Sequence, residues 1–120
     1  MIQEDKDLLL KDLCARIPYY VKCNYNDIYN KHNGTLMSIN NNRVTIDGIC
    51  KDIADVKPYL FPMSSMTEEQ EKELNNYLIT DKKIMMGSVK EIDWLYKHHF
   101  DVHNLIPYGL AINATGLNIY

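Results

Sequence analysis

The apolar residues near the start of the chain recur at helical spacing. Leu9, Leu13 and Ile17 fall on one stripe, with Leu10 and Cys14 beside it, which predicts a helix over residues 4–16. The helix should end at Pro18, because the residue before a proline avoids helical geometry. We expect the apolar stripe to face the core.

After Pro18 the pattern changes to alternation, which is typical of half-buried strands. Residues 19–25 place Tyr19, Val21, Cys23 and Tyr25 on one face and so predict a strand. Residues 35–39 and 43–47 flank three asparagines at 40–42. Because asparagine tolerates left-handed backbone angles, these segments predict a hairpin.

The remaining elements are less regular along the chain. They are an edge strand at 55–57, a helix starting at Thr67, a helix starting at Ser88, and a strand or packed tail at 105–114. Thr67 with Gln70, and Ser88 with Glu91, match the capping box that begins helices. Pro58 restricts the strand before it to a sheet edge.

Segregation of strands from helices along the chain favours an α+β fold over an alternating α/β fold. We expect a small, strongly bent antiparallel β-sheet of three to five short strands, packed by about three helices. A length of 120 residues predicts a single domain over residues 1–120.

Composition and charge narrow the classes of function. The proportions of apolar (46%) and charged (24%) residues are those of a globular protein. The longest apolar run, Leu8–Leu10, is too short for a membrane helix, and the acidic N-terminal residues do not form a signal peptide. A net charge of −3 with scattered basic residues argues against a nucleic-acid partner.

The cysteine and glycine patterns carry little chemistry. Cys14, Cys23 and Cys50 are odd in number and lack C-x-x-C spacing, which predicts buried free thiols in a reducing compartment. The glycines are isolated, which removes phosphate-loop and dinucleotide fingerprints. We expect no cofactor.

The densest polar cluster lies after the third predicted helix and contains His98, His99, Asp101 and His103. His99 and His103 have the spacing that places two imidazoles on one helix face, as in metal sites. A helix that ends before Asp101 would break that geometry, and cations at a helix C-terminus also satisfy its carbonyls. We expect no metal, and a His-dependent enzyme or metal site at 98–103 remains an alternative that requires these side chains to converge.

Tyrosine is over-represented, with nine in the chain. Tyr19 and Tyr20 open the first predicted strand, so one ring should enter the core and the other should face outward. An aromatic ring with Lys22 or Arg43 nearby could stack on a nucleotide base, although tyrosine also fills cores in proteins of AT-rich genomes. Tyr20, Lys22 and Arg43 are therefore candidate ligand- or partner-binding residues.

Trp94 lies off the helical stripe formed by Ile92, Leu95 and Tyr96. Either the buried arc of that helix is wide, or Trp94 marks an interaction face. Trp94 joins the candidate partner-binding residues for this reason.

Three stretches form a pattern that covers most of the chain. They are residues 11–19, residues 56–69 and residues 93–111, which run from Asp93-Trp94-Leu95 to Gly109-Leu110-Ala111. Together they resemble an uncharacterised family of small proteins from Bacteroides-type phages, prophages and mobile elements. The resemblance implies a bacterial cytoplasm. The family often has arginine where this chain has Phe61 and His103.

These observations favour a non-enzymatic binding or interaction module of phage or mobile-element origin, with a host or phage protein as its partner. The first alternative is a protein that sequesters a small ligand, a nucleotide signal used in host defence, held between tyrosine and lysine or arginine side chains. A homo-oligomer with the ligand at its joint would suit that alternative. The second alternative is the His-dependent site at residues 98–103.

Overall fold

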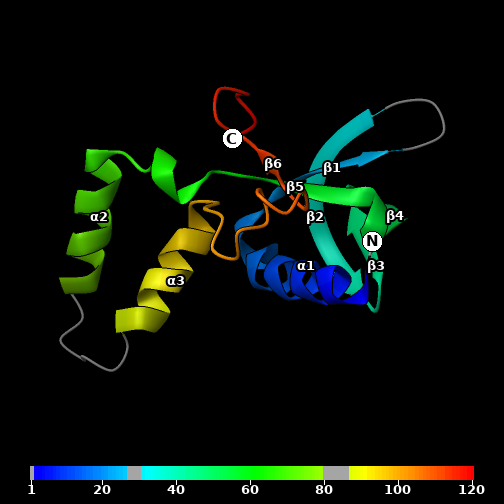
Figure 1. Ribbon diagram of the computed structural model, residues 1–120, viewed down its shortest axis with the longest axis horizontal. Helices are drawn as coiled ribbons and strands as arrows, with labels where there is room; N and C mark the ends of the chain where they lie inside the picture. The colour runs from blue at the N-terminus through cyan, green and yellow to red at the C-terminus, as the bar shows by residue number, and fades with distance from the viewer. Residues whose placement is uncertain (1, 27–30, 80–86) are drawn as a thin grey trace.

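The computed structural model describes residues 2–26, 31–79 and 87–120, which form three α-helices and one six-stranded mixed sheet (Figure 1). The elements are α1 Gln3–Arg16, β1 Lys22–Asn26, β2 Lys31–Asn40, β3 Arg43–Ile46, β4 Ile49–Asp52, β5 Val56–Leu60, α2 Glu68–Ile79, α3 Gly87–Lys97 and β6 Ile112–Asn113, with short 3-10 turns η1 Ile17–Tyr19, η2 Ile53–Asp55 and η3 Met63–Ser65. The α+β class is confirmed. Each helix in the described ranges is too short or too polar to cross a membrane.

The strand order is β4-β3-β2-β1-β5-β6, and every neighbouring pair is antiparallel except β5 with β6. The prediction of a purely antiparallel sheet with at most five strands was therefore wrong. The strand that was not predicted is β4, in which no residue is buried, so no hydrophobic alternation marks it. The last strand, β6, falls within the strand or tail predicted at 105–114 but is only two residues long. The prediction of an edge strand at 55–57 was wrong, because β5 lies between β1 and β6. Proline is tolerated in β5 because β6 pairs only with Tyr59 and Leu60 and leaves Pro58 without a partner on that side.

The predicted hairpin is confirmed as β2–β3. Asn40 pairs with Arg43, and Asn41 takes the left-handed conformation with φ of 55°. A second hairpin joins β3 to β4 through Asp47 and Gly48, whose φ values are 50° and 85°. Asp-Gly is a preferred pair for such two-residue turns, because both positions need positive φ.

Helix α1 packs against one face of the sheet, and the main core lies between them. Its buried residues include Leu9 and Leu13 from the predicted stripe, but also the charged residues Asp12 and Arg16. Cys14 is exposed, contrary to prediction, because those two charged side chains occupy the buried side of the helix instead.

The three cysteines are free, but only Cys23 is buried, so the prediction of three buried thiols was wrong. Burial raises the pKa of the Cys23 thiol to about 12. Cys50 is exposed because it lies on the edge strand β4.

Tyr19 and Tyr20 do not open a strand. Pro18 lies in the 3-10 turn η1, which starts at Ile17, and Tyr20 caps the end of that turn with φ of 57° and ψ of 45°. The Tyr19 hydroxyl donates a hydrogen bond to Asp93 of α3, while the Tyr20 side chain is 72% exposed. Neither ring enters the core, and the alternation holds only from Val21 onward.

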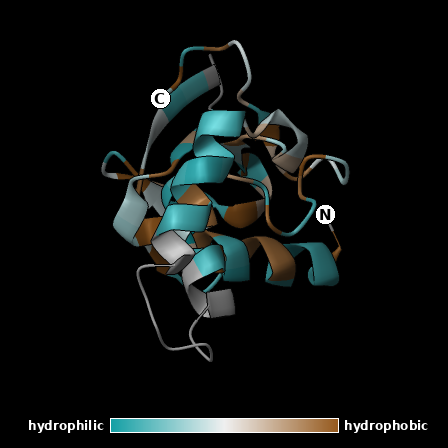
Figure 2. Ribbon diagram, turned by 90° about the vertical axis from the view of Figure 1, so that its left-hand side faces the viewer, coloured by the Kyte–Doolittle hydropathy of each residue, from teal (hydrophilic) through white to brown (hydrophobic). Residues whose placement is uncertain are grey.

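Helices α2 and α3 form a lobe at one end of the molecule, which measures 50 × 30 × 25 Å (Figure 1). A second apolar cluster holds the lobe together and contains Leu74, Trp94, Leu95 and Phe100. The outward side of α2 is hydrophilic (Figure 2). The capping box of α2 is confirmed, since Thr67 and Gln70 exchange backbone-to-side-chain hydrogen bonds of 2.9 and 3.1 Å. The Ser88 side chain, needed to test the second capping box, lies outside the described residues.

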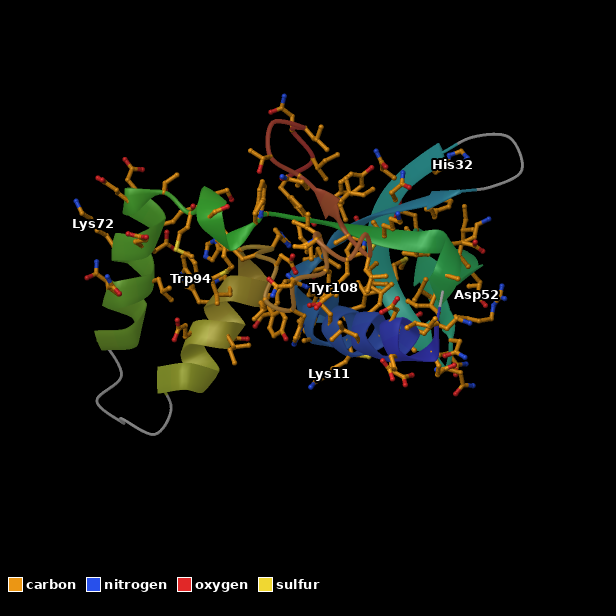
Figure 3. All side chains as sticks on the ribbon, viewed as in Figure 1. Lys11, His32, Asp52, Lys72, Trp94 and Tyr108 are labelled. Atoms are coloured by element: carbon orange, nitrogen blue, oxygen red, sulfur yellow. The ribbon has the colours of Figure 1, made fainter. Side chains whose placement is uncertain are left out.

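Trp94 lies between α2 and α3 and is 2% exposed (Figure 3). The buried arc of α3 is therefore wide, and Trp94 is not an interaction residue. The wide arc arises because α3 packs against α2 on one side and the segment after Lys97 on another, where Phe100 stacks 5.9 Å from Trp94.

We expect Trp94→Ala to lower the free energy of unfolding by about 3–5 kcal/mol, because it removes a large buried ring. Urea unfolding followed by circular dichroism measures this. Ile92→Ala is the control on the same helix, since Ile92 is 42% exposed; it should cost about 0.5 kcal/mol or less. Equal costs for the two variants would contradict the assignment of Trp94 to the core.

Candidate functional site

The side chains of the histidine cluster diverge. Helix α3 ends at Lys97, and His99 has φ of 65°, so His99 and His103 do not share a helix face. The His98 ring lies 4.2 Å from the Trp94 ring, and its Nε2 lies 3.5 Å from Oε1 of Glu73 in α2. The His99 ring instead stacks on Tyr120 at 3.8 Å.

The other two members also have structural partners. Both carboxylate oxygens of Asp101 accept backbone hydrogen bonds, from Leu105 at 2.8 Å and Ile106 at 2.9 Å. Nδ1 of His103 lies 2.9 Å from Oδ1 of Asp12, on α1. Within the described ranges no group of three or more His, Cys, Asp or Glu side chains is arranged to hold a metal. His98, His99, Asp101 and His103 therefore do not converge, as the alternative of a site at 98–103 required.

A buried charged network on α1 explains the position of His103. Arg16 is fully buried and donates from Nε to Oδ2 of Asp12 at 2.6 Å and from Nη2 to Oδ1 at 3.1 Å. Nη2 also donates to the carbonyl of Phe100 at 2.6 Å, and the guanidinium lies 4.8 Å from the centre of the Tyr96 ring. A buried arginine needs such partners because desolvating its charge is costly.

This network was not identified from the sequence. Its one signal was the four-residue spacing of Asp12 and Arg16, which fits an ordinary pair on a helix surface. The burial of the pair depends on Phe100, 84 residues further along the chain.

The candidate binding site that the structure does assemble lies around Tyr20. A hollow of about 370 Å³ is lined by Ile17, Tyr20, Thr35, Leu36, Met37 and Asp47. It lies where η1 meets the middle of β2 and the β3–β4 turn. Tyr20 and Met37 are 72% and 57% exposed, so two large apolar side chains stand open at this site.

Polar groups flank the same hollow. Nζ of Lys22 donates to Oγ1 of Thr35 at 2.5 Å, which brings the ammonium beside it. Oδ1 of Asp47 accepts from the backbone amide of Thr35 at 3.1 Å, which fixes the orientation of that carboxylate. The site therefore combines an aromatic ring, a thioether, a cation and a carboxylate.

Of the other predicted binding residues, Arg43 lies elsewhere. It pairs with Asn40, five residues beyond Thr35 on β2, or about 17 Å along the strand. Its Nε donates to Sγ of Cys50 at 3.2 Å. Tyr20 lines the hollow, and Lys22 reaches it only through its hydrogen bond to Thr35. The lining does not include the other predicted residues, which are Arg43, Trp94, His98, His99, Asp101 and His103.

Thr35, Met37 and Asp47 were missed by the sequence analysis. The Asp47-Gly48 dipeptide could have indicated a turn and so placed Asp47 beside β2. Met37 carried no such signal, because a bulge between Leu36 and Ser38 sets its position.

Comparison of the chain with models of known protein families, with curated proteins and with solved structures finds no match.

We expect Asp12→Asn to lower the free energy of unfolding by about 3–5 kcal/mol, because it leaves the buried Arg16 guanidinium without its counter-charge. Asp7→Asn is the matched control: Asp7 is on the same helix, is exposed, and accepts a side-chain hydrogen bond from Gln3 at 2.8 Å. That control should change stability by about 0.5 kcal/mol or less. A cost below about 1 kcal/mol for Asp12→Asn would contradict the role given to the pair.

His99 should make the fold sensitive to acid. Burial, with Arg16 and His98 nearby, lowers its pKa from 6.5 to about 4. As pH falls from about 6.5 to 4, the unfolded chain takes up this proton before the folded chain does, so stability decreases over that range. Below pH 4 both states are protonated and this contribution changes no further.

The test compares the unfolding free energy of wild type and His99→Asn from pH 7.5 to 4.5. Asparagine tolerates the positive φ at this position. The variant should lose less stability over this range than wild type does. Parallel pH profiles for the two proteins would show that His99 does not contribute.

Proposed function

We propose that the protein is a non-enzymatic binding module whose binding surface is the hollow around Tyr20. The proposal includes an origin in a phage or mobile element and a host or phage protein as partner in a bacterial cytoplasm. The resemblance carried by residues 11–19, 56–69 and 93–111 supports that origin.

The observation that carries the proposal is the conformation of Tyr20. Its φ of 57° and ψ of 45° lie in the left-handed region, which costs a bulky residue about 1–2 kcal/mol relative to glycine or asparagine. The ring is 72% exposed, so burial does not offset that cost. Strained residues that persist in this way are concentrated at binding and catalytic sites.

The surroundings of Tyr20 fit a binding surface. Tyrosine and methionine are enriched in the buried centres of interfaces, and methionine adapts its shape to different partners. Here Tyr20 and Met37 line one hollow together with the partly buried Ile17. A bound partner would cover these exposed apolar side chains.

Sequestration of a small ligand is a second candidate, favoured by the size and chemistry of the hollow. Its volume of about 370 Å³ is comparable to that of small-molecule sites, which start at about 300 Å³. Tyr20 lines the hollow, and the Lys22 ammonium donates to Thr35, another lining residue, so a ring and a cation are available to a nucleotide. The same surface serves both candidates.

Tyr20→Asn tests the proposal. Asparagine tolerates the left-handed conformation, so the variant should be as stable as wild type or more stable by up to about 1 kcal/mol. It should also lose the bound partner. Immobilised protein is exposed to bacterial lysate, and mass spectrometry identifies the retained proteins and small molecules.

Tyr108→Asn is the matched control, because Tyr108 is 69% exposed and lies outside the hollow. It should retain whatever wild type retains. Equal retention by wild type and Tyr20→Asn would refute the Tyr20 hollow as the binding surface.

A further inference from the structure

The open apolar side chains of the hollow suit a flat ring. Tyr20 and Met37 are both exposed, and the half-buried Ile17 and the buried Leu36 complete the apolar lining. A tyrosine ring packs well on another aromatic face, and a thioether makes favourable contacts with aromatic rings. The apolar part of the site therefore favours a planar aromatic ligand over a flexible aliphatic one.

Asp47 adds an acceptor of fixed orientation beside that lining. Oδ1 is held by the Thr35 amide, and Oδ2 lies over Gly34, where an added Cβ would come within 2.6 Å of it. Within the described residues, no lysine, arginine or histidine forms an ion pair with this exposed carboxylate. Its two oxygens keep lone pairs for donors supplied by a ligand.

The Asp47 carboxylate distinguishes between nucleobases by the hydrogen-bond donors that each base presents. A carboxylate binds best to two adjacent N–H donors in one plane. Guanine presents such a pair on one edge, its ring N1–H and its exocyclic N2 amine. Adenine and cytosine each present an amine beside an acceptor nitrogen, which the carboxylate would repel.

Beside the apolar lining and the carboxylate acceptor, Lys22 supplies a positive charge. Its ammonium donates to the Thr35 hydroxyl, which itself lines the hollow. A compact lysine cation held at Thr35 suits a single phosphate group of a ligand in the hollow. Arg43, on β3 opposite Asn40 of β2, lies too far along the sheet to contact the same group.

We infer that the hollow binds a guanine nucleotide, with the base against Tyr20 and Met37, its N–H edge on Asp47 and its phosphate near Lys22. This inference rests on the proposed function, because it uses the Tyr20 hollow as the binding surface. It adds the chemical class of the ligand.

The test is titration of the full chain with GMP and with AMP, followed by calorimetry and by amide NMR shifts. GMP should bind at least about tenfold more tightly than AMP, the size of one bidentate pair. The amides of Thr35, Met37 and Asp47 should shift most, because they surround the hollow.

Asp47→Asn removes the negative charge and replaces one of the two carboxylate oxygens with an NH₂ group. The remaining amide oxygen can still accept from the Thr35 amide, and asparagine tolerates the positive φ at this position. The substitution should weaken GMP about tenfold or more and abolish the preference over AMP. Asp52→Asn is the matched control, since Asp52 also accepts a backbone hydrogen bond, from Ala54 at 2.9 Å. Asp52 pairs with Arg43, at the opposite end of the β3–β4 pair from Asp47, and Asp52→Asn should leave GMP affinity unchanged.

Equal affinity for GMP and AMP, no binding of either, or GMP binding that Asp47→Asn does not weaken would each overturn the guanine inference. Such a result combined with Tyr20-dependent retention from lysate would leave the proposed function intact with another ligand. If retention is also independent of Tyr20, the proposed function fails as well. The two failures are therefore distinguishable.

Discussion

The fold depends on compensating the charge of one fully buried guanidinium. Arg16 stands at the last turn of α1, and its charge cannot leave water without compensation. Asp12 provides the counter-charge from one turn earlier, and the Phe100 carbonyl provides an acceptor from the other end of the chain. Helix α1 can therefore pack on the sheet in this way only when the segment after α3 is in place.

Because Arg16 needs the Phe100 carbonyl, the polar residues after α3 stabilise the fold. The Phe61 amide donates to the His99 carbonyl and the Asp101 amide donates to the Phe61 carbonyl, so Phe100 is held beside the end of β5. Further along, the Tyr120 hydroxyl accepts from the Lys22 amide and donates to the Tyr59 carbonyl, joining β1 to β5. The chain after α3, which provides the Phe100 carbonyl for Arg16, thus also stabilises the β1–β5 pair.

The sequence predicted the elements whose causes are local. The β2–β3 hairpin follows from asparagines that tolerate left-handed angles, and the α2 capping box follows from Thr67 and Gln70 alone. For Trp94 the sequence left a wide buried arc and an interaction face as alternatives, because its burial depends on α2 and on Phe100, which helical periodicity does not report. Tyr20 of the hollow and its neighbour Lys22 were predicted from the sequence, but Asp47 was not, because its position beside β2 comes from strand register.

The buried guanidinium also accounts for the exposed tyrosine. Arg16 and Val21 are both fully buried, so residues 17–20 must turn the chain from α1 into β1 between two fixed points. Pro18 sets the first part of that turn, and a left-handed residue at Tyr20 completes it. A side chain at this position points outward, and glycine or asparagine would adopt the left-handed conformation at a lower free-energy cost than tyrosine. A tyrosine at this position therefore places a large aromatic ring on a rigid turn beside the hollow, where little conformational entropy is lost on binding.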